Sequence, residues 1–294
     1  MSNNSLKSSE LVLAPNGSLY HINMTGDTLA DNVFLVGDPD RVNMFKKIFD
    51  KVEFESQNRE LHALTGTYHG NRYTALSTGM GCDNIDIVVT ELDAAANINL
   101  NERTINPVHR SLNLIRIGTS GSLHSDIPCG TLLASAYAIG LDGLLNYYSH
   151  DDNQFEEEMT QAFTKHMLFN ERLARPYCVK ASESLLEKVA PFTKKGITAT
   201  APGFYAPQGR HIRIAPSIPD LNEKLASFLW DGLKVTNLEM ECSAIYGLSK
   251  IMGHNALTVC LIIANRADGT FLNDYHDKMF DTITKIMDAI TVKG

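Results

Sequence analysis

Short apolar runs alternate along the chain with longer segments in which apolar residues recur every three or four positions. Residues 32–42 and 235–253 each predict a strand that passes directly into a helix. Strands that alternate with helices indicate an α/β fold around a central sheet. The other runs predict strands at 112–123, 130–139, 196–205 and 256–266, and helices at 83–98, 155–169, 181–190, 219–231 and 273–290.

Turn-forming residues and linkers refine this outline. A His-Gly-Asn turn between two apolar runs predicts a β-hairpin over residues 60–81. Asp83 is the expected cap of the helix at 83–98. No linker rich in Pro, Gly or Ser divides the chain, so we expect one domain over residues 19–294, preceded by a flexible leader at 1–18.

Polar motifs follow the expected strands at the points where they end. They come after Val36, Ile117, Ala201 and Leu238, and at Arg266. Ligands of α/β proteins collect outside the carboxyl ends of strands. We therefore expect these motifs to form one shared site.

Composition narrows the classes of partner and cofactor. The 294 residues carry a formal net charge of −8, so nonspecific binding to nucleic acid or to an anionic membrane is not expected. The five cysteines are scattered without a CxxC pair, which indicates reduced thiols and a cytoplasmic protein. The ten histidines form no HxxxH pair, so no metal is expected. No apolar run is long enough to span a membrane.

Two motifs could bind an anion. In GDPDR, Gly37 allows close approach of the backbone, the following helix start offers free N–H groups, and Arg41 adds a guanidinium. The alternative is an ordinary strand-to-helix turn with a solvated arginine. In RIGTSGS, Thr119 and its neighbours could form an anion nest. Arg116 lies within an apolar strand and requires a buried anionic partner, either a ligand or a structural carboxylate.

A third motif, NLEMECS, places Glu239 and Glu241 on either side of Met240. On an extended chain both carboxylates would face the same way, and they could bind the vicinal hydroxyls of a sugar or share a proton. The alternative is a solvated helix start, where acidic residues are favourable in any case.

The fourth motif is FYAPQGR, residues 204–210. On an extended chain Gln208 and Arg210 would share a face. A planar amide and a guanidinium match the alternating acceptors and donor along one edge of uracil, and Phe204 could contact its ring. The alternative is a turn with one packed aromatic side chain.

The ordered motifs GDPDRV, STGMG, RIGTSG, FYxxQGR, EMEC and ANR resemble the nucleoside phosphorylase family, and most closely its uridine phosphorylase branch, from about Tyr20 to the last helix. The resemblance implies a single α/β domain with a central mixed β-sheet, partly barrel-like, flanked by α-helices. It also implies reversible phosphorolysis of uridine by inorganic phosphate to uracil and ribose 1-phosphate. Such an enzyme is a pentosyltransferase of pyrimidine salvage, with phosphate as co-substrate and no cofactor.

The resemblance also assigns roles to individual residues. Residues matching the phosphate site are Gly37, Arg41, Arg59, Arg116 and Thr119. Residues matching the ribose site are His21, Glu239, Met240 and Glu241. Residues matching the base site are Phe204, Gln208, Arg210 and Arg266. Four of these, Arg116, Thr119, Gln208 and Arg210, are expected to act in catalysis.

Shared active sites follow from the same resemblance. Arg59 and His21 match residues that a neighbouring subunit contributes, with Tyr20 lining the pocket there, so a homodimer or a hexamer built from dimers is expected. Some bacterial relatives hold a monovalent cation with a Glu and a Ser. Here Glu60 matches the Glu but Asn84 stands at the Ser position, so a cation is not expected. The segment at 99–111 is longer than in short bacterial members.

Three alternative functions remain. A purine-preferring phosphorylase would share the phosphate and ribose sites, although the stretch TAPGFYAPQGR lacks the aspartate that the purine branch uses. A nucleosidase of the same fold would use water in place of phosphate. A nucleoside-binding homologue without catalysis would bind uridine but not convert it.

Overall fold

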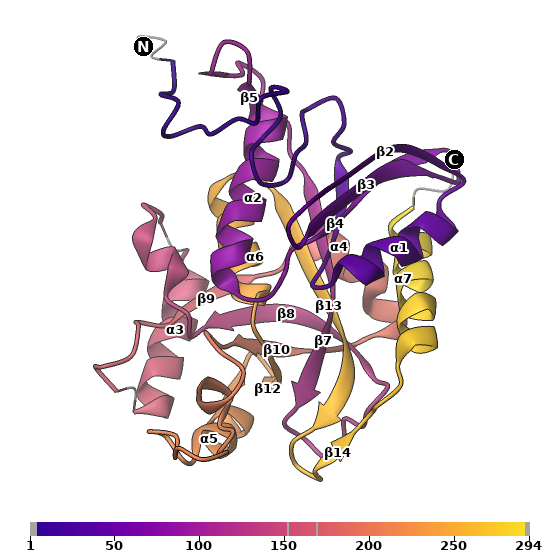
Figure 1. The fold of residues 1–294 in the computed structure, drawn as a ribbon. Coiled ribbons are helices and arrows are strands. Elements are labelled where there is room, and N and C mark those ends of the chain that lie inside the picture. The colour runs from indigo at the N-terminus through magenta and orange to yellow at the C-terminus, as the bar shows by residue number, and fades with distance from the viewer. Residues whose placement is uncertain (1–4, 152, 169, 292–294) are drawn as a thin grey trace.

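The computed structural model describes residues 5–151, 153–168 and 170–291 (Figure 1). Twelve strands of these residues form one mixed sheet. In spatial order its main path is β11 (Leu229–Trp230), β12 (Leu233–Glu239), β10 (Lys194–Thr200), β8 (Leu132–Gly140), β13 (Asn255–Asn265), β7 (Asn113–Ser122), β1 (Asn32–Val36), β4 (Asn71–Ser77), β3 (Leu61–Tyr68) and β2 (Lys51–Asn58). Short strands β14 (Thr270–Phe271) and β9 (Tyr177–Lys180) pair with β13 and β8, and β5 (Ile98–Asn99) pairs with β6 (Thr104–Ile105).

Part of the sheet closes into a barrel. Strand β12 follows β10 and β8 along the path, yet it also pairs antiparallel with β7 through Asn237 opposite Ser122 and Leu238 opposite Gly121. The strands β7, β13, β8, β10 and β12 therefore form a ring, and β1, β4, β3 and β2 extend from it as an open sheet. The prediction of a mixed, partly barrel-like sheet is confirmed.

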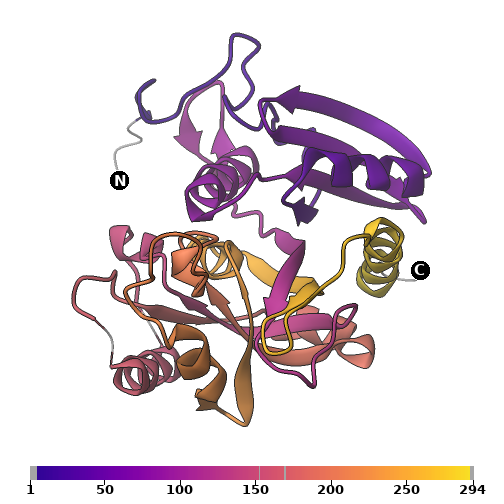
Figure 2. The same ribbon diagram turned by 60° about the horizontal axis from the view of Figure 1, so that its bottom comes forward.

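Helices cover both faces of the open part of the sheet (Figures 1 and 2). Successive residues of β1 point to opposite faces of the sheet and explain this double cover. Phe34 packs in a core shared with α1 and α7, whereas Leu35 packs in a second core with α2 and α6. The helices are α1 (Pro39–Ile48), α2 (Cys82–Asn97), α3 (Gln154–Met167), α4 (Glu183–Val189), α5 (Leu221–Ser227), α6 (Cys242–Ile251) and α7 (His276–Ile290), with short 3₁₀ segments η1 (Leu144–Tyr147), η2 (Ala190–Phe192) and η3 (Ala206–Gln208).

Most predicted elements are present, including the 60–81 hairpin, but three details were wrong. The strand expected to reach residue 205 ends at Thr200. The helix expected to reach residue 231 ends at Ser227 and is followed by β11. Gly81, with φ of 96°, precedes the first helical residue of α2 without a side-chain cap, so Asp83 lies in the first turn instead of capping it.

Part of the expected leader is packed against the domain, within residues 5–18. Leu11 is buried in the core with α2, and its carbonyl oxygen accepts a hydrogen bond from Arg103 Nη1 at 2.6 Å. The backbone N–H of Leu6 donates to the carbonyl oxygen of Arg103 at 2.8 Å. The 99–111 segment, which includes β6, therefore provides the surface on which this stretch rests.

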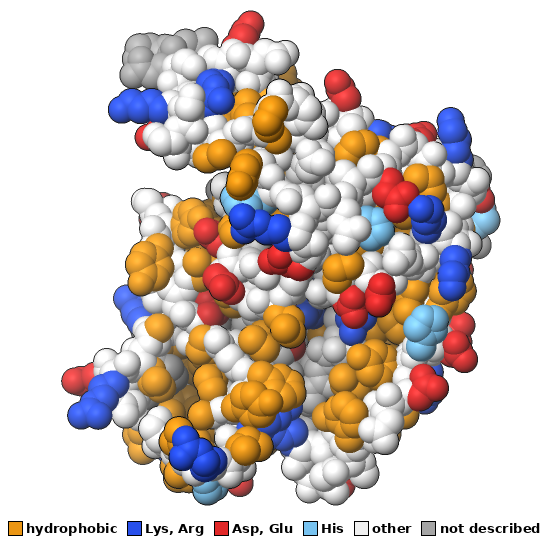
Figure 3. Space-filling view, in the orientation of Figure 1, with side chains coloured by type: hydrophobic (Ala, Val, Ile, Leu, Met, Phe, Trp, Pro, Cys, Tyr) orange, Lys and Arg blue, Asp and Glu red, His pale blue; other side chains and the backbone are white. Residues whose placement is uncertain are grey.

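The outer surface agrees with the acidic composition. On the face drawn in Figure 3, acidic and basic side chains are interspersed and form no continuous basic field. Within the described parts of the chain, none of the helices has the length and apolar character needed to cross a membrane.

Candidate active site

A cavity of about 690 Å³ lies where β1, β7 and β12 end. It brings together motifs that are far apart in the sequence, as their positions at strand ends predict. The predicted site residues that line it are Gly37, Arg41, Arg116, Thr119, Phe204, Gln208, Arg210, Glu239, Met240 and Glu241.

Arg116 occupies the centre of this cavity wall. Its guanidinium forms an ion pair with Glu241 and lies 3.5 Å from Glu239 Oε2. Burial opposes the charge on Arg116, but the two carboxylates outweigh burial and raise its pKa. The sequence left open whether the anionic partner of Arg116 is a ligand or a structural carboxylate. The structure provides structural carboxylates, those of Glu239 and Glu241.

Gly118 makes room for this arginine. A Cβ atom at Gly118 would lie 1.8 Å from Arg116 Nη1 and 2.6 Å from Cζ. Residues two apart on a strand share a face, so the guanidinium folds back over the position of its own second neighbour. A glycine at position 118 is therefore a condition for the observed ion pair.

The two glutamates play different structural parts. Glu239 ends β12, and its carboxylate accepts hydrogen bonds from the backbone N–H groups of Glu241 and Cys242, both at 2.9 Å, and from Thr200 Oγ1 at 2.6 Å. Burial raises the pKa of Glu239, and Arg116 opposes this rise. Glu241 accepts from the backbone N–H of Gly81 at 2.8 Å and contacts Arg116. Glu239 thus holds the start of α6, while Glu241 faces the cavity with fewer protein donors.

The FYAPQGR motif is a turn, so the extended geometry expected for Gln208 and Arg210 was wrong. Segment η3 and Gly209, with φ of 68°, fold the chain back on itself. The two side chains nevertheless meet, because Arg210 Nη1 donates to Gln208 Oε1 at 2.7 Å. Arg210 also lies over the ring of Phe204, 3.8 Å from its centroid. The turn presents the amide, the guanidinium and the aromatic ring as one group.

Arg210 stays charged in this setting. Burial, with a smaller effect of the nearby positive charge of Arg266, lowers the pKa of Arg210 to about 10. This value is still well above neutral pH. Arg266 itself packs beside Gly121, and no described residue accepts a hydrogen bond from its buried Nη1.

Another part of the cavity lining combines a helix start with arginine. Asp38 caps α1 by accepting a hydrogen bond from the backbone N–H of Asp40 at 2.9 Å, which fixes the turn that carries Gly37. Arg41 lies in the first turn of α1, with its guanidinium carbon 6.0 Å from the ring centroid of Tyr275. Thr119, on β7, completes this end of the cavity.

Three predicted residues are absent from the cavity lining formed by the described residues: His21, Arg59 and Arg266. His21 Nδ1 lies 2.6 Å from Glu91 Oε1. Arg59 lies in the exposed turn between β2 and β3, with φ of 54°. The side chain of Asn58 donates to the carbonyl oxygens of Tyr20 and His21 at 2.9 and 3.1 Å. His21 and Arg59 therefore lie close together on the surface.

Sequence reasoning missed several lining residues. Ser120 lines the cavity and belongs to the possible anion nest that the sequence indicated, whereas Gly121 of the same RIGTSGS motif was not singled out. Met80, within the STGMG motif, and Phe271, outside the motifs, are exposed apolar side chains that contribute to the lining and were given no role from the sequence.

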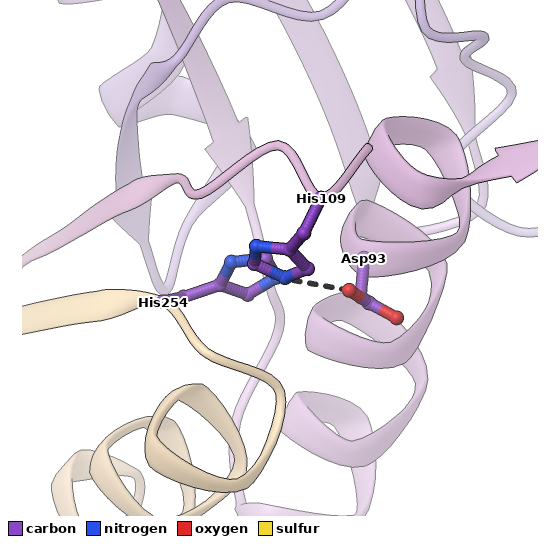
Figure 4. A group of neighbouring side chains, drawn as sticks. All are labelled: Asp93, His109 and His254. Atoms are coloured by element: carbon purple, nitrogen blue, oxygen red, sulfur yellow. Dashed lines mark ion pairs between the residues drawn. The ribbon is translucent and has the colours of Figure 1, made fainter. Parts of the chain in front are cut away.

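A separate group of possible metal ligands lies outside this lining: Asp93 on α2, exposed His109 and buried His254 (Figure 4). His254 Nε2 lies 3.2 Å from Asp93 Oδ1. The other ring nitrogen of His254 accepts a hydrogen bond from the backbone N–H of Leu112, so the neutral ring carries its hydrogen on Nε2. His109 Nε2 lies 2.9 Å from the carbonyl oxygen of Met252, which leaves the lone pair on Nδ1 of a neutral ring free. A metal ligand needs a free lone pair on the coordinating nitrogen, and His254 does not offer one toward Asp93, so this group is a poor fit to a metal centre.

Known proteins resemble most of the chain. A sequence model described as "Phosphorylase superfamily" matches residues 32–291. The chain is 30% identical over 263 residues to a uridine phosphorylase of Thermococcus kodakarensis, covering 87% of this chain and 80% of the relative. It is 28% identical over 243 residues to a DeoD-type purine nucleoside phosphorylase of Shewanella loihica, covering 82% of this chain and 84% of the relative. A solved Trypanosoma brucei nucleoside phosphorylase that shows uridine phosphorylase activity superposes with a TM-score of 0.86 at 29% identity, covering 95% of this chain and 99% of the other.

Proposed function

The chain belongs to the phosphorylase superfamily, and from this premise we propose that it is a uridine phosphorylase, a pentosyltransferase that converts uridine and inorganic phosphate reversibly to uracil and ribose 1-phosphate. One observation carries the choice of substrate. The group formed by Phe204, Gln208 and Arg210 lies in the same cavity as Arg41, Arg116 and Thr119.

We propose that phosphate binds at the end of the cavity formed by Gly37, Arg41, Arg116 and Thr119. The N-terminus of α1 offers backbone N–H groups and the positive end of its dipole. The guanidinium groups can each donate two hydrogen bonds to phosphate oxygens. A phosphate dianion beside Arg116 would share this guanidinium with Glu241, so the arginine links the phosphate to the sugar site.

We propose that the ribose lies against Met240 and that Glu241 binds its hydroxyl groups. The oxygens of Glu239 are already used by the first turn of α6 and by Thr200. Its contribution to the ribose site is therefore to hold Glu241 in place. A carboxylate beside the sugar also favours the positive charge that develops on the ring when the base departs.

We propose that Gln208 and Arg210 bind the polar edge of uracil, with Phe204 against its ring and Arg266 near a carbonyl. The departing uracil carries negative charge in the transition state. A charged guanidinium fixed beside a carbonyl oxygen stabilises that anion without donating a proton. Phosphate and uracil at opposite ends of the sugar give the geometry for displacement at the anomeric carbon.

We propose that His21 and Arg59 complete the cavity of a neighbouring subunit in a homodimer or a hexamer built from dimers. Both lie outside the cavity of their own chain but close to each other at the surface. An exposed guanidinium and an imidazole on neighbouring surface segments would suit a second phosphate contact and a ribose contact. We also propose a cytoplasmic location, as the cysteine pattern indicates.

The test is release of uracil from uridine with and without phosphate. We expect strict phosphate dependence and formation of ribose 1-phosphate. Equal rates without phosphate would show a nucleosidase, and binding without turnover in either direction would show a nucleoside-binding protein.

A purine-preferring phosphorylase is the second candidate, because DeoD-type purine nucleoside phosphorylases are among the relatives. A panel of uridine, thymidine, deoxyuridine and inosine distinguishes the two. Uridine should give the highest kcat/KM, and a preference for inosine would reverse the assignment.

A further inference from the structure

A chain of buried polar groups runs from the interior of the barrel to the cavity wall. Ser135 Oγ lies 2.5 Å from Thr198 Oγ1, which donates to Asn237 Oδ1 at 2.9 Å. The amide nitrogen of Asn237 donates in turn to Ser120 Oγ at 2.9 Å. Asn237 and Thr198 are fully buried, and Ser120 is 6% exposed and lines the cavity.

The direction of these bonds decides what Ser120 can offer. Asn237 Oδ1 faces the hydroxyl groups of Thr198 and Thr236, so the amide nitrogen is the atom turned toward Ser120. An amide nitrogen only donates, so Ser120 Oγ must accept. The single hydroxyl hydrogen of Ser120 is then left to point elsewhere.

The position of Ser120 on β7 indicates where that hydrogen is available. Arg116, Gly118 and Ser120 alternate with their neighbours and share one face of the strand. Arg116 meets Glu241 on this face, at the proposed ribose site. Gly121, the next residue, packs against Arg266 beside the proposed base site. The sulfur of Cys260 is a hydrogen-bond partner of the Ser120 side chain, and a thiol sulfur is a weak acceptor that an oxygen of a ligand can replace.

We propose that Asn237 is a positioning residue that makes Ser120 a hydrogen-bond donor to an oxygen of the bound nucleoside, where sugar and base join. This inference rests on the proposed function. Asn237 touches no substrate itself and acts only through Ser120. The buried hydroxyl groups behind it hold the amide in the one orientation that leaves the Ser120 hydrogen free for the ligand.

The substitution Asn237→Asp tests this arrangement with almost no change of shape. Burial at this position raises the pKa of the introduced carboxyl group, so kcat/KM is measured up to the highest pH that the wild type tolerates. Once ionised, the carboxylate still accepts from Thr198 and Thr236 but also accepts from Ser120, so the Ser120 hydrogen turns away from the cavity. The structure predicts a fall in kcat/KM for uridine of about 3- to 10-fold, the loss expected for one neutral hydrogen bond. Ser120→Ala should cause a similar fall in kcat/KM for uridine. In both variants KM for phosphate should change little.

The double variant separates positioning from a general structural role. If Asn237 acts through Ser120, then Asn237→Asp should cause no further loss in the Ser120→Ala background, within about twofold. A full additional loss in the double variant would overturn the proposal. So would an unchanged kcat/KM in Asn237→Asp alone, or an effect confined to KM for phosphate.

Two controls keep the outcome interpretable. Asn113→Asp makes the same chemical change at the other end of β7, where the side chain bonds only Asn32 and Asn255, and it should leave kcat/KM unchanged. Thermal unfolding identifies any variant that loses activity because it is unstable. If Asn237→Asp is unstable, Asn237→Ser replaces it in the double-mutant cycle with Ser120→Ala. A wild-type protein that releases no uracil with phosphate would refute the proposed function, whereas an active wild type with additive variants would refute only the role of Asn237.

Discussion

The space that Gly118 leaves for Arg116 gives the sharpest prediction. In Gly118→Ala the added methyl carbon would lie 1.8 Å from Arg116 Nη1 and 3.0 Å from Nη2. No strain arises in the backbone, because φ at this position is not positive. The guanidinium must therefore move by more than an ångström, and the conformation of one side chain carries the whole effect.

The cost of that movement can be worked from the contacts it disturbs. Arg116 is 6% exposed, and both of its charged partners are buried as well. Removing one partner of a buried ion pair lowers the free energy of unfolding by about 3–5 kcal/mol. Displacing Arg116 without removing it should lower the free energy of unfolding by part of this amount. Loss of a charge-assisted hydrogen bond of about 1.5–3 kcal/mol should also raise KM for phosphate at least tenfold.

The assay compares KM for phosphate, KM for uridine and the thermal unfolding midpoint in the wild type and three variants. Gly121→Ala should be much milder than Gly118→Ala, because its methyl group meets other atoms only at 3.7 Å or more. Arg116→Lys added to Gly118→Ala should cause little further loss, because the guanidinium is already displaced. An unchanged KM for phosphate in Gly118→Ala, with an unchanged unfolding midpoint, would refute the reasoning.

Three further predictions follow from the site and the core. Gln208→Ala should lower kcat/KM for uridine about 10-fold or more while leaving KM for phosphate nearly unchanged, because the half-buried Arg210 loses the buried amide that it contacts; a large loss of phosphate affinity would contradict the base-site assignment. Arg59→Ala and Arg41→Ala should each impair phosphate use, and mixed subunits should recover activity in hybrid dimers; the absence of recovery under demonstrated subunit exchange would count against shared sites. Phe34→Ala should lower the free energy of unfolding by about 3–5 kcal/mol, measured with urea, because Phe34 is fully buried between α1 and the sheet.

Regular elements of this fold were readable from the sequence because their apolar spacing matches their burial. The helices α2 and α7 and the strands β7 and β13 lie close to their predicted bounds. Strand β2 was missed although KVEFESQN alternates polar and apolar residues over its first five positions and exposes only polar ones, the pattern of a half-buried edge strand. The pairing of β12 with β7 could not be predicted, because it depends on how far the whole sheet curls.

Site residues were predictable where a motif fixes the local chemistry, and less so where packing decides it. The motifs identified the arginines, the glutamates and the 204–210 segment. The turn at 204–210 was the alternative that the sequence left open, and Pro207 and Gly209 favour it. The contact that joins Gln208 to Arg210 within this turn was not predicted. The contribution of Asn237 was invisible in the sequence, because it depends on a neighbour 117 positions away.

Closure of the barrel has a consequence for folding. Arg116 and Glu241 are 125 residues apart, and they meet because β7 and β12 complete the ring between them. A partly folded chain with an open ring would hold neither half of the cavity in place, so catalytic competence should arise in a single late step. Saturating phosphate should then lengthen the lifetime of the native protein in denaturant, because an anion at the proposed phosphate site would bridge the seam at which the barrel has to come apart.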